Sequence, residues 1–283
     1  MCDVGGDIID DAIDVISDVV DFVVDLVIDF VSWINPMPDI PDYGDNNSDL
    51  VARGVLLNKI SANSHIPVVY GTRKVGGNIV FVESSGTENE FLYMAIVVSE
   101  GEIDDITSIF INDNLVTFDG DLQDNVERSV ASSDSNYFKA DPTVDGSSAE
   151  SLITVRPHYG TDSQTACSLL STLSSWTSNH RLRGLAYISL KFKWNSDAFG
   201  SLPNITAIVK GRKVYNPNLD STVTGGSGSH RKDDSTTWEY SDNGIYQMLD
   251  YLRNDRFGMG IADSYFDSNF ADWQTAGDVV DAN

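Results

Sequence analysis

Cysteine is scarce in this sequence. Cys2 and Cys167 are the only two among 283 residues, and they lie far apart and outside any C-x-x-C pattern. This usage predicts two free thiols and no disulfide framework. Positive charge is missing at the start of the chain as well, because the first lysine or arginine is Arg53. A secretory signal needs basic residues before its apolar run, so no export signal is expected.

Histidine is also scarce, and no catalytic motif is present. The four histidines form no i, i+4 pair and no cluster with cysteine, so a zinc site is not expected. We expect His65 at a strand edge and His158 hydrogen-bonded in a turn. The glycine-rich stretch 71–77 lacks the G-K-[ST] ending of a phosphate loop and predicts a tight turn. The sequence therefore predicts no catalytic, cofactor-binding or metal-binding residues and a protein that is not an enzyme. Weak Ca²⁺ binding by the carboxylates of 119–124 is left open.

Basic residues are few relative to acidic ones. The chain has 18 Lys and Arg against 43 Asp and Glu, which gives a formal net charge of −25 at pH 7. Proteins bind nucleic acid mainly by neutralising phosphates with Lys and Arg, so sequence-specific nucleic-acid binding is not expected. The hydrophobic share of 41% is typical of a globular protein, and the length allows a sizeable core.

The segment 7–33 is an apolar run interrupted by aspartates at helical spacing. Steps of three and four residues gather every carboxylate except Asp10 into one acidic stripe on a helix whose remaining surface is nearly all Ile, Val, Leu and Phe. This stripe is the candidate lumen or interface surface, and its members are Asp7, Asp11, Asp14, Asp18, Asp21, Asp25 and Asp29.

Three interpretations of this helix are possible. It packs on protein with its aspartates in solvent, it lines a wet lumen in an oligomer, or it enters a membrane. Membrane spanning is the least favoured, because each aspartate near a bilayer centre costs about 2.5–3.5 kcal/mol.

A Pro- and Gly-containing linker at 35–49 ends this helix, and the pattern then changes to that of β-strands. Strands are expected at 78–84 and at 90–100, the second buried on both faces. The segment 106–118 predicts a hairpin that turns at Asn112–Asp113–Asn114, residues that tolerate positive φ. Residues 119–150 predict a long surface loop.

The second half of the chain mixes helices and strands. A helix capped by Thr161 or Asp162 is expected over 161–176, with leucines on one face. Strands follow at 182–194 and 205–217, the latter folding back tightly around Lys210–Gly211. A flexible loop is expected at 224–235 and a helix at 241–255.

The glycines after residue 255 predict the end of that helix, and a last helical pattern runs to the end of the chain. Five basic residues in the strands are expected to pair with the abundant carboxylates, in the same chain or across an interface. They are Lys191, Lys193, Lys210, Arg212 and Lys213.

Together these elements predict an α+β fold that is mainly β. We expect mixed or antiparallel β domains with an inserted helix, preceded by a long N-terminal amphipathic helix. Three parts are expected: 1–45, the striped helix and linker; 46–240, the β-rich part with surface loop 119–150; and 241–283, the helical start of a following domain. The chain ends inside a helical pattern without a Gly or Pro stop, so we expect it to be truncated.

Several short motifs occur in a fixed order along the chain. Ile-Pro-Val-x-Tyr-Gly stands at Ile66–Gly71, Arg-x-Val-Gly-Gly at Arg73–Gly77 and Glu-Gly-x-Ile at Glu100–Ile103. An Asp-x-Leu-x-x-x-Arg-Tyr/Phe-Gly-x-Gly signature follows at 250–260, after a strand pair at 182–217 that contains Pro-Asn and a Gly-Arg turn.

With these motifs, most of residues 50–283 resembles the N-terminal hub region of siphophage central tail proteins. This is the family of J-like tail tip attachment (host specificity) proteins and gene transfer agent hubs. The resemblance does not cover residues 7–33.

The resemblance implies a structural virion protein without cofactors. It would form a homotrimer at the tail tip, cap the tail tube and gate DNA ejection. Its implied partners are the distal tail protein, the tape measure protein, other tail tip or fibre proteins and, through missing C-terminal domains, a host surface receptor. The implied location is the virion tail tip, after assembly in the host cytoplasm. Two alternatives are a tail-associated hydrolase of cell wall or capsule polysaccharide and a membrane-active ejection protein acting through residues 7–33.

Overall fold

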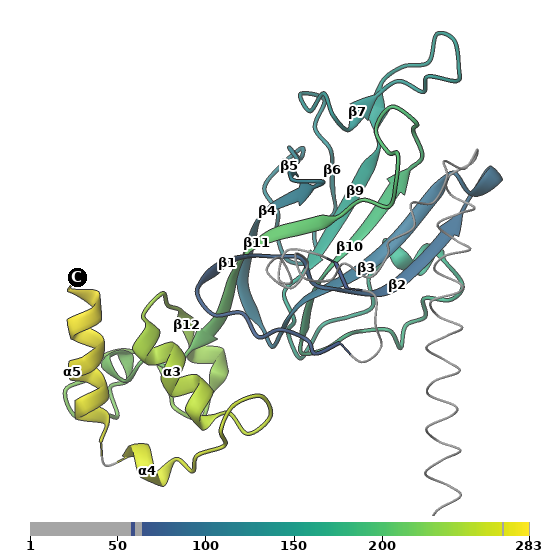
Figure 1. Cartoon of the computed structure of the whole chain (residues 1–283). Coiled ribbons are helices and arrows are strands. Elements are labelled where there is room, and N and C mark those ends of the chain that lie inside the picture. The colour runs from purple at the N-terminus through teal and green to yellow at the C-terminus, as the bar shows by residue number, and fades with distance from the viewer. Residues whose placement is uncertain (1–57, 60–63, 268, 283) are drawn as a thin grey trace, which may run out of the picture.

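The computed structural model describes residues 58, 59, 64–267 and 269–282. The predicted helix at 7–33, its seven stripe aspartates and the whole linker at 35–49 lie outside these residues. The described part consists of a β body, residues 64–214, and a helical lobe, residues 215–282. Figure 1 shows helices α3, α4 and α5 gathered at one end of the molecule, with β7 at the opposite end. The domain bounds expected from the sequence stay a prediction.

Two antiparallel sheets form the β body. The first has the strand order β2-β3-β10-β9-β6 and the second the order β1-β11-β4-β5, with β12 also pairing with β11. A small separate sheet pairs β7 with β8. The strands are β1 Thr72–Val75, β2 Asn78–Ser85, β3 Phe91–Glu100, β4 Ile103–Ile111, β5 Asn114–Leu115, β6 Arg128–Ser129, β7 Phe138–Lys139, β8 Glu150–Ser151, β9 Ile153–His158, β10 Leu185–Lys193, β11 Ile205–Val214 and β12 Glu239–Tyr240.

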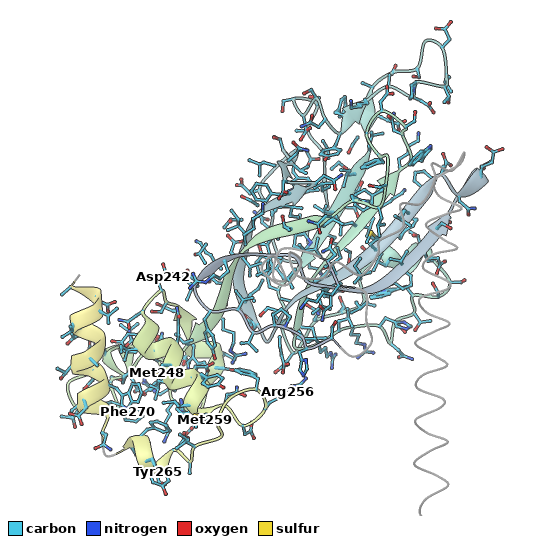
Figure 2. The ribbon with its side chains drawn as sticks, viewed as in Figure 1. Asp242, Met248, Arg256, Met259, Tyr265 and Phe270 are labelled. Atoms are coloured by element: carbon cyan, nitrogen blue, oxygen red, sulfur yellow. The ribbon has the colours of Figure 1, made fainter. Side chains whose placement is uncertain are left out.

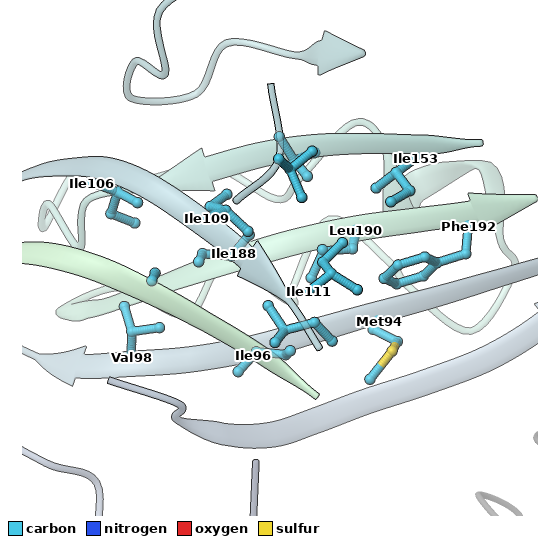
Figure 3. Packing of buried hydrophobic residues seen from close by; sticks show 14 of the residues in the cluster. Met94, Ile96, Val98, Ile106, Ile109, Ile111, Ile153, Ile188, Leu190 and Phe192 are labelled. Atoms are coloured by element: carbon cyan, nitrogen blue, oxygen red, sulfur yellow. The ribbon is translucent and has the colours of Figure 1, made fainter. Parts of the chain in front are cut away.

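The main core lies between the two sheets (Figure 3). Because side chains alternate across a strand, β3 directs Met94, Ile96 and Val98 into this core. Its other face buries Tyr93, Ala95 and Val97 against the irregular segment that follows β9. Strand β3 is therefore buried on both faces, as its unbroken apolar sequence predicts.

Several sequence predictions are confirmed by the strands. The fold is mainly β with antiparallel sheets and few helices. The hairpin of β4 and β5 turns at Asn112 and Asp113, whose φ angles are 49° and 63°. These are residues that occupy the left-handed region at low cost.

The prediction of a tight fold-back at Lys210–Gly211 is wrong. Strand β11 runs unbroken through both residues. Gly211 serves a close approach instead of a turn, since a Cβ placed on it would lie 2.0 Å from the carbonyl oxygen of Val69. The backbone nitrogens of Gly211 and Arg212 donate to Gly71 and Val69, at 2.9 and 2.8 Å. A glycine inside a strand pattern indicates such an approach as well as a turn.

The predicted helix at 161–176 is also wrong, and the fold has no inserted α-helix among the described residues. Only a 3₁₀ turn, η2 Leu170–Thr172, forms there. The side-chain hydroxyl of Ser171 donates to the carbonyl of Cys167, and that of Thr172 to Leu169. Ser and Thr that bond nearby backbone offer it alternatives to a helix. The leucines are buried as expected, but they cover the outer face of the first sheet from an irregular chain.

His158 does not lie in a turn. It is the last residue of β9, is buried, and stacks on Tyr187 with 4.3 Å between ring centroids. Its Nε2 has no hydrogen-bond partner among the described residues, contrary to the expectation. Residues 119–150 are mostly irregular, as predicted, and are anchored by the buried side chains of Val130 and Tyr137.

The helical lobe contains three α-helices around a small aromatic core. They are α3 Gly244–Arg253, α4 Ser264–Asp267 and α5 Phe270–Asp281. Asn243 caps α3 by accepting a hydrogen bond from the backbone nitrogen of Ile245. Tyr215, Leu249, Phe266 and Phe270 form the core of the lobe.

The remaining 3₁₀ turns are η1 Thr87–Asn89, η3 Pro217–Leu219 and η4 Ser235–Thr237. Among the described residues, no helix has the length and apolar character that crossing a membrane requires.

Candidate functional site: the junction of the β body and the helical lobe

The β body and the helical lobe meet at a buried ion pair. The Nε of Arg212, near the end of β11, lies 3.2 Å from a carboxylate oxygen of Asp250 in α3. The side chains are 15% and 5% exposed, so the pair is largely removed from water. A charged pair in such a place is stable only when both members have partners, because desolvation is costly.

Two aromatic residues complete the surroundings of this pair. The hydroxyl of Tyr70 donates a hydrogen bond to the same oxygen of Asp250. Burial, and then the charge of Asp250, raise the pKa of Tyr70 well above its usual range, so the phenol stays protonated and keeps donating. The ring of Phe257 lies over the guanidinium of Arg212, 4.9 Å from its central carbon.

Glycines allow the close contacts at this junction. A Cβ on Gly101 would lie 1.9 Å from a terminal nitrogen of Arg212, and Gly101 has a φ of 82°. A Cβ on Gly258 would lie 1.8 Å from the carbonyl oxygen of Tyr251, where the chain turns back after α3. Side chains at these positions would displace the arginine or the turn.

A second ion pair crosses the junction at its rim. Arg256 of the lobe pairs with Glu100 at the end of β3, and the arginine is 72% exposed whereas the glutamate is 16% exposed. An exposed pair of this kind contributes little to stability, about 0–1 kcal/mol. It lies next to Phe257 in the loop after α3, so it adds a second contact between that loop and the β body. Figure 2 labels Arg256 at the side of the lobe that faces the β body.

The sequence motifs converge at this junction. Four separate motifs contribute residues to it. The first three supply Tyr70, then Glu100 and Gly101, and then Arg212. The last motif supplies Asp250, Arg256, Phe257 and Gly258. Residues as far apart in the chain as Tyr70 and Asp250, 180 positions, contact each other here. The motif residues thus join the β body to the helical lobe through structural contacts.

Pairing of the strand cations with carboxylates is confirmed in part. Lys193 pairs with Glu150 at 2.5 Å, Lys213 with Glu102 at 3.0 Å, and Arg212 with Asp250. Lys191 and Lys210 instead lie over aromatic rings, 4.1 Å from the ring centroid of Phe91 and 5.8 Å from that of Tyr240.

The helical lobe also contains a cavity of about 600 Å³. Three of the carboxylates that line it, those of Asp220, Asp234 and Asp267, are bound by other residues of the chain. Asp220 accepts hydrogen bonds from Tyr215, Thr222 and Arg231, at 2.8, 2.6 and 3.2 Å. Burial works to raise the pKa of Asp220, but the bonds from Thr222, Tyr215 and Arg231 outweigh it and lower that pKa. A carboxylate bound in this way is a structural anchor and not a free acid or base.

No group of three or more His, Cys, Asp or Glu suited to a metal ion occurs among the described residues, including 119–124. Cys167 is a free, buried thiol whose pKa is raised by burial. The seven stripe aspartates, Asp7 to Asp29, lie outside the described residues, so the structure does not place them. The sequence does not indicate the junction as a site, because it gives no distances between the motifs to which the junction residues belong.

Comparison with known proteins agrees with a structural role. No protein family model matches the chain. Over 244 residues, 75% of this chain, it is 28% identical to the baseplate hub protein pb3 of Escherichia phage T5. The chain spans 24% of the length of that relative.

This similarity supports a structural protein of a phage tail or baseplate, located in the virion. With it, the prediction of a non-enzymatic structural protein is confirmed. Among solved structures, a chain of the virion of a native gene transfer agent particle is 15% identical, with a TM-score of 0.38. That match covers 70% of this chain and 37% of the other.

Proposed function

We propose that the chain is the proximal part of a central tail hub of a long-tailed phage and belongs to the J-like tail tip family. The observation that supports this most directly is the 28% identity to a baseplate hub protein across 75% of the chain. The junction adds support, because the residues of the resemblance motifs form one interlocked contact instead of lying scattered.

In this role the chain forms a homotrimer at the tail tip, caps the tail tube and organises tail tip assembly. Its partners are the distal tail protein, the tape measure protein and other tail tip or fibre proteins. Host attachment takes place through regions beyond this chain. The protein is assembled in the host cytoplasm and resides at the virion tail tip.

The acidic composition fits a conduit for DNA. With 43 acidic against 18 basic residues, the chain repels phosphate and leaves a passing nucleic acid mobile. A trimeric hub would gate DNA ejection without binding particular sequences. The stripe of Asp7 to Asp29 would then face the central axis.

A cryo-EM reconstruction of the assembled tail tip tests this proposal. The expected result is three copies of the β body around the tail axis, directly below the tube, with Asp14, Asp18, Asp21 and Asp25 toward the lumen. A chain found in the capsid, in a peripheral fibre or as a single copy would overturn the hub assignment. Aspartates that face bulk solvent on a hub that is otherwise as expected would overturn the lumen hypothesis alone.

A further inference from the structure

Helix α3 buries Tyr246, Leu249 and Asp250 on its inner face, and yet it exposes large apolar side chains on its outer face. It buries Asp250, which is 5% exposed, and turns Met248 and Tyr251 outward, at 46% and 44% exposed. A surface helix normally places polar residues on its solvent face. The burial of Asp250 is explained by Arg212 at the junction, but nothing in the described residues covers Met248 and Tyr251.

The turn after α3 enlarges this apolar surface. The backbone nitrogen of Met259 donates to the carbonyl of Tyr251 at 3.1 Å, so Met259 returns to the side of the helix. Met259 is 62% exposed. Together Met248, Tyr251 and Met259 form what we call the Met–Tyr patch, and Figure 2 labels both methionines on the helical lobe.

The patch is held in a fixed place. Gly260 donates to the carbonyl of Asn254 at 2.9 Å, and Ile261 donates to that of Leu252 at 2.9 Å. The side chain of Asn254 accepts from the backbone nitrogens of Arg256 and Phe257, at 3.0 and 3.2 Å. Gly258 lies against the carbonyl of Tyr251, where no larger residue fits. Met259 is therefore presented by an ordered turn, not by a frayed helix end.

The charge around the patch is one-sided. Residues 215–282 contain twelve Asp and Glu but only four basic side chains. Each of the four is already paired: Arg231 with Asp220, Lys232 with Asp267, Arg253 with Asp263, and Arg256 with Glu100. The exposed carboxylates that remain, such as Asp242 and Asp255, add to the negative charge of the lobe that bears the patch.

We infer that the Met–Tyr patch docks a basic amphipathic segment of a partner protein, with apolar anchors flanked by Lys or Arg. Methionine and tyrosine suit such a role, because Met adapts its shape to a partner and Tyr is enriched among residues that dominate binding energy. Charge complementarity selects the occupant. At this acidic lobe, an anionic membrane, a nucleic acid or the equally acidic lobe of a second copy would be repelled. The inference does not depend on the proposed hub function, since it uses only the surface of the lobe.

The probe that tests this inference is a 14-residue helical peptide of leucine and lysine, with leucines at i, i+3, i+4 and i+7. Fluorescence anisotropy should show saturable binding to the full chain at low salt. Replacing the patch by serine (M248S/Y251S/M259S) should weaken binding roughly tenfold or more. The matched control is L115S/V144S, which removes two side chains of the β body that are each 55% exposed. It should leave binding unchanged.

Three outcomes would overturn the inference. One is equal binding by the patch variant and the control variant, and another is equal binding of an all-lysine peptide of the same charge. The third is concentration-dependent self-association that the patch variant abolishes, because the occupant would then be a second copy. Met259→Lys provides a second variant if the triple substitution does not fold. It should also weaken binding of the basic peptide, through charge repulsion. Unchanged binding to this single variant would likewise contradict the inference.

Discussion

At the scale of single residues, the molecule depends on polar groups that are buried with a specific partner. Arg212 and Asp250 illustrate this, because neither charge would be tolerated alone at its depth. Asp250 could be picked out from sequence as a motif member, but its partner could not. Helical spacing puts Asp250 on the same face of α3 as buried Tyr246 and Leu249, and the contact with Arg212 explains how a charge is tolerated there.

The first prediction concerns this pair. Asp250→Asn leaves the guanidinium of Arg212 buried without a counter-charge, so the free energy of unfolding should fall by about 2–4 kcal/mol. Chemical denaturation at pH 7 measures the change. The control is Asp255→Asn, five positions further along at an exposed site, which should shift stability by no more than about 0.5 kcal/mol.

A double variant separates the pair from local effects of the substitution. Adding Arg212→Met to Asp250→Asn removes the unpaired charge and should recover part of the loss. If the double variant is as unstable as the sum of the two single variants, then the two residues do not act as a pair.

The second prediction concerns the pH dependence caused by His158. Burial, together with the charge of Arg156, lowers the pKa of His158 to about 4 from its ordinary value of 6.5. The folded state therefore binds this proton less readily than the unfolded state does. The stabilising contribution is complete above pH 6.5 and is lost as the pH falls through 6.5 toward about 4. The loss should reach about 3 kcal/mol, because each pKa unit corresponds to about 1.4 kcal/mol.

His158→Phe isolates this effect, since it preserves stacking on Tyr187 and removes the titrating group. The difference in unfolding free energy between the original protein and this variant should change across pH 6.5 to 4 and be flat above pH 7. A difference that is constant over the whole range would show that His158 does not titrate differently in the two states.

At the scale of elements, strands with strong alternation or unbroken apolar runs were predictable, and irregular segments were not. Strand β3 was recognised because ten consecutive residues fit a strand buried on both faces. The 161–176 segment has leucines at helical spacing, but its Ser and Thr hydroxyls bond nearby carbonyls, and the sheet beneath it accepts those leucines from an irregular chain. Local periodicity cannot distinguish these outcomes, because the deciding partner is a distant sheet.

The conformation at Gly211 likewise depends on a distant partner, and the third prediction concerns this residue. A glycine within a strand pattern is compatible with a turn or with a close backbone approach, and the structure shows the approach to Val69. Gly211→Ala should lower the free energy of unfolding by more than about 2 kcal/mol, because its Cβ meets backbone atoms that cannot move aside. Thermal or denaturant unfolding measures this loss of stability.

Gly200→Ala is the matched control for this glycine. A Cβ there meets nothing within 4 Å. Its effect should therefore stay near zero or be slightly stabilising, through a less flexible unfolded chain. If both substitutions change the free energy of unfolding equally, then Val69 does not lie close enough to Gly211 to exclude a Cβ.

At the scale of the whole molecule, charge was predictable from composition, whereas the place where the motifs meet was not. The motif residues occur at intervals of tens of positions, and sequence order gives no distance between them. Only the pairing of β11 with the chain at Val69–Gly71, and the attachment of α3 beneath it, bring Tyr70, Arg212 and Asp250 together. The resemblance motifs could thus be noticed in the sequence, but their shared mechanical role could not.

The final prediction follows from the net charge of −25. Like charges confined to a compact state repel one another, and added salt screens that repulsion over a Debye length of about 10 Å at 0.1 M. Salt also weakens exposed ion pairs such as Lys74–Asp113 and Lys213–Glu102, but each of these contributes about 1 kcal/mol or less. With 43 acidic side chains against 18 basic ones, relief of repulsion outweighs that loss. The midpoint of thermal unfolding should therefore rise by roughly 3–8 °C between 20 and 500 mM NaCl. Choline chloride should give a similar rise, because screening does not depend on the cation. A midpoint that falls with salt would mean that specific ion pairs, and not net repulsion, dominate the electrostatics of this chain.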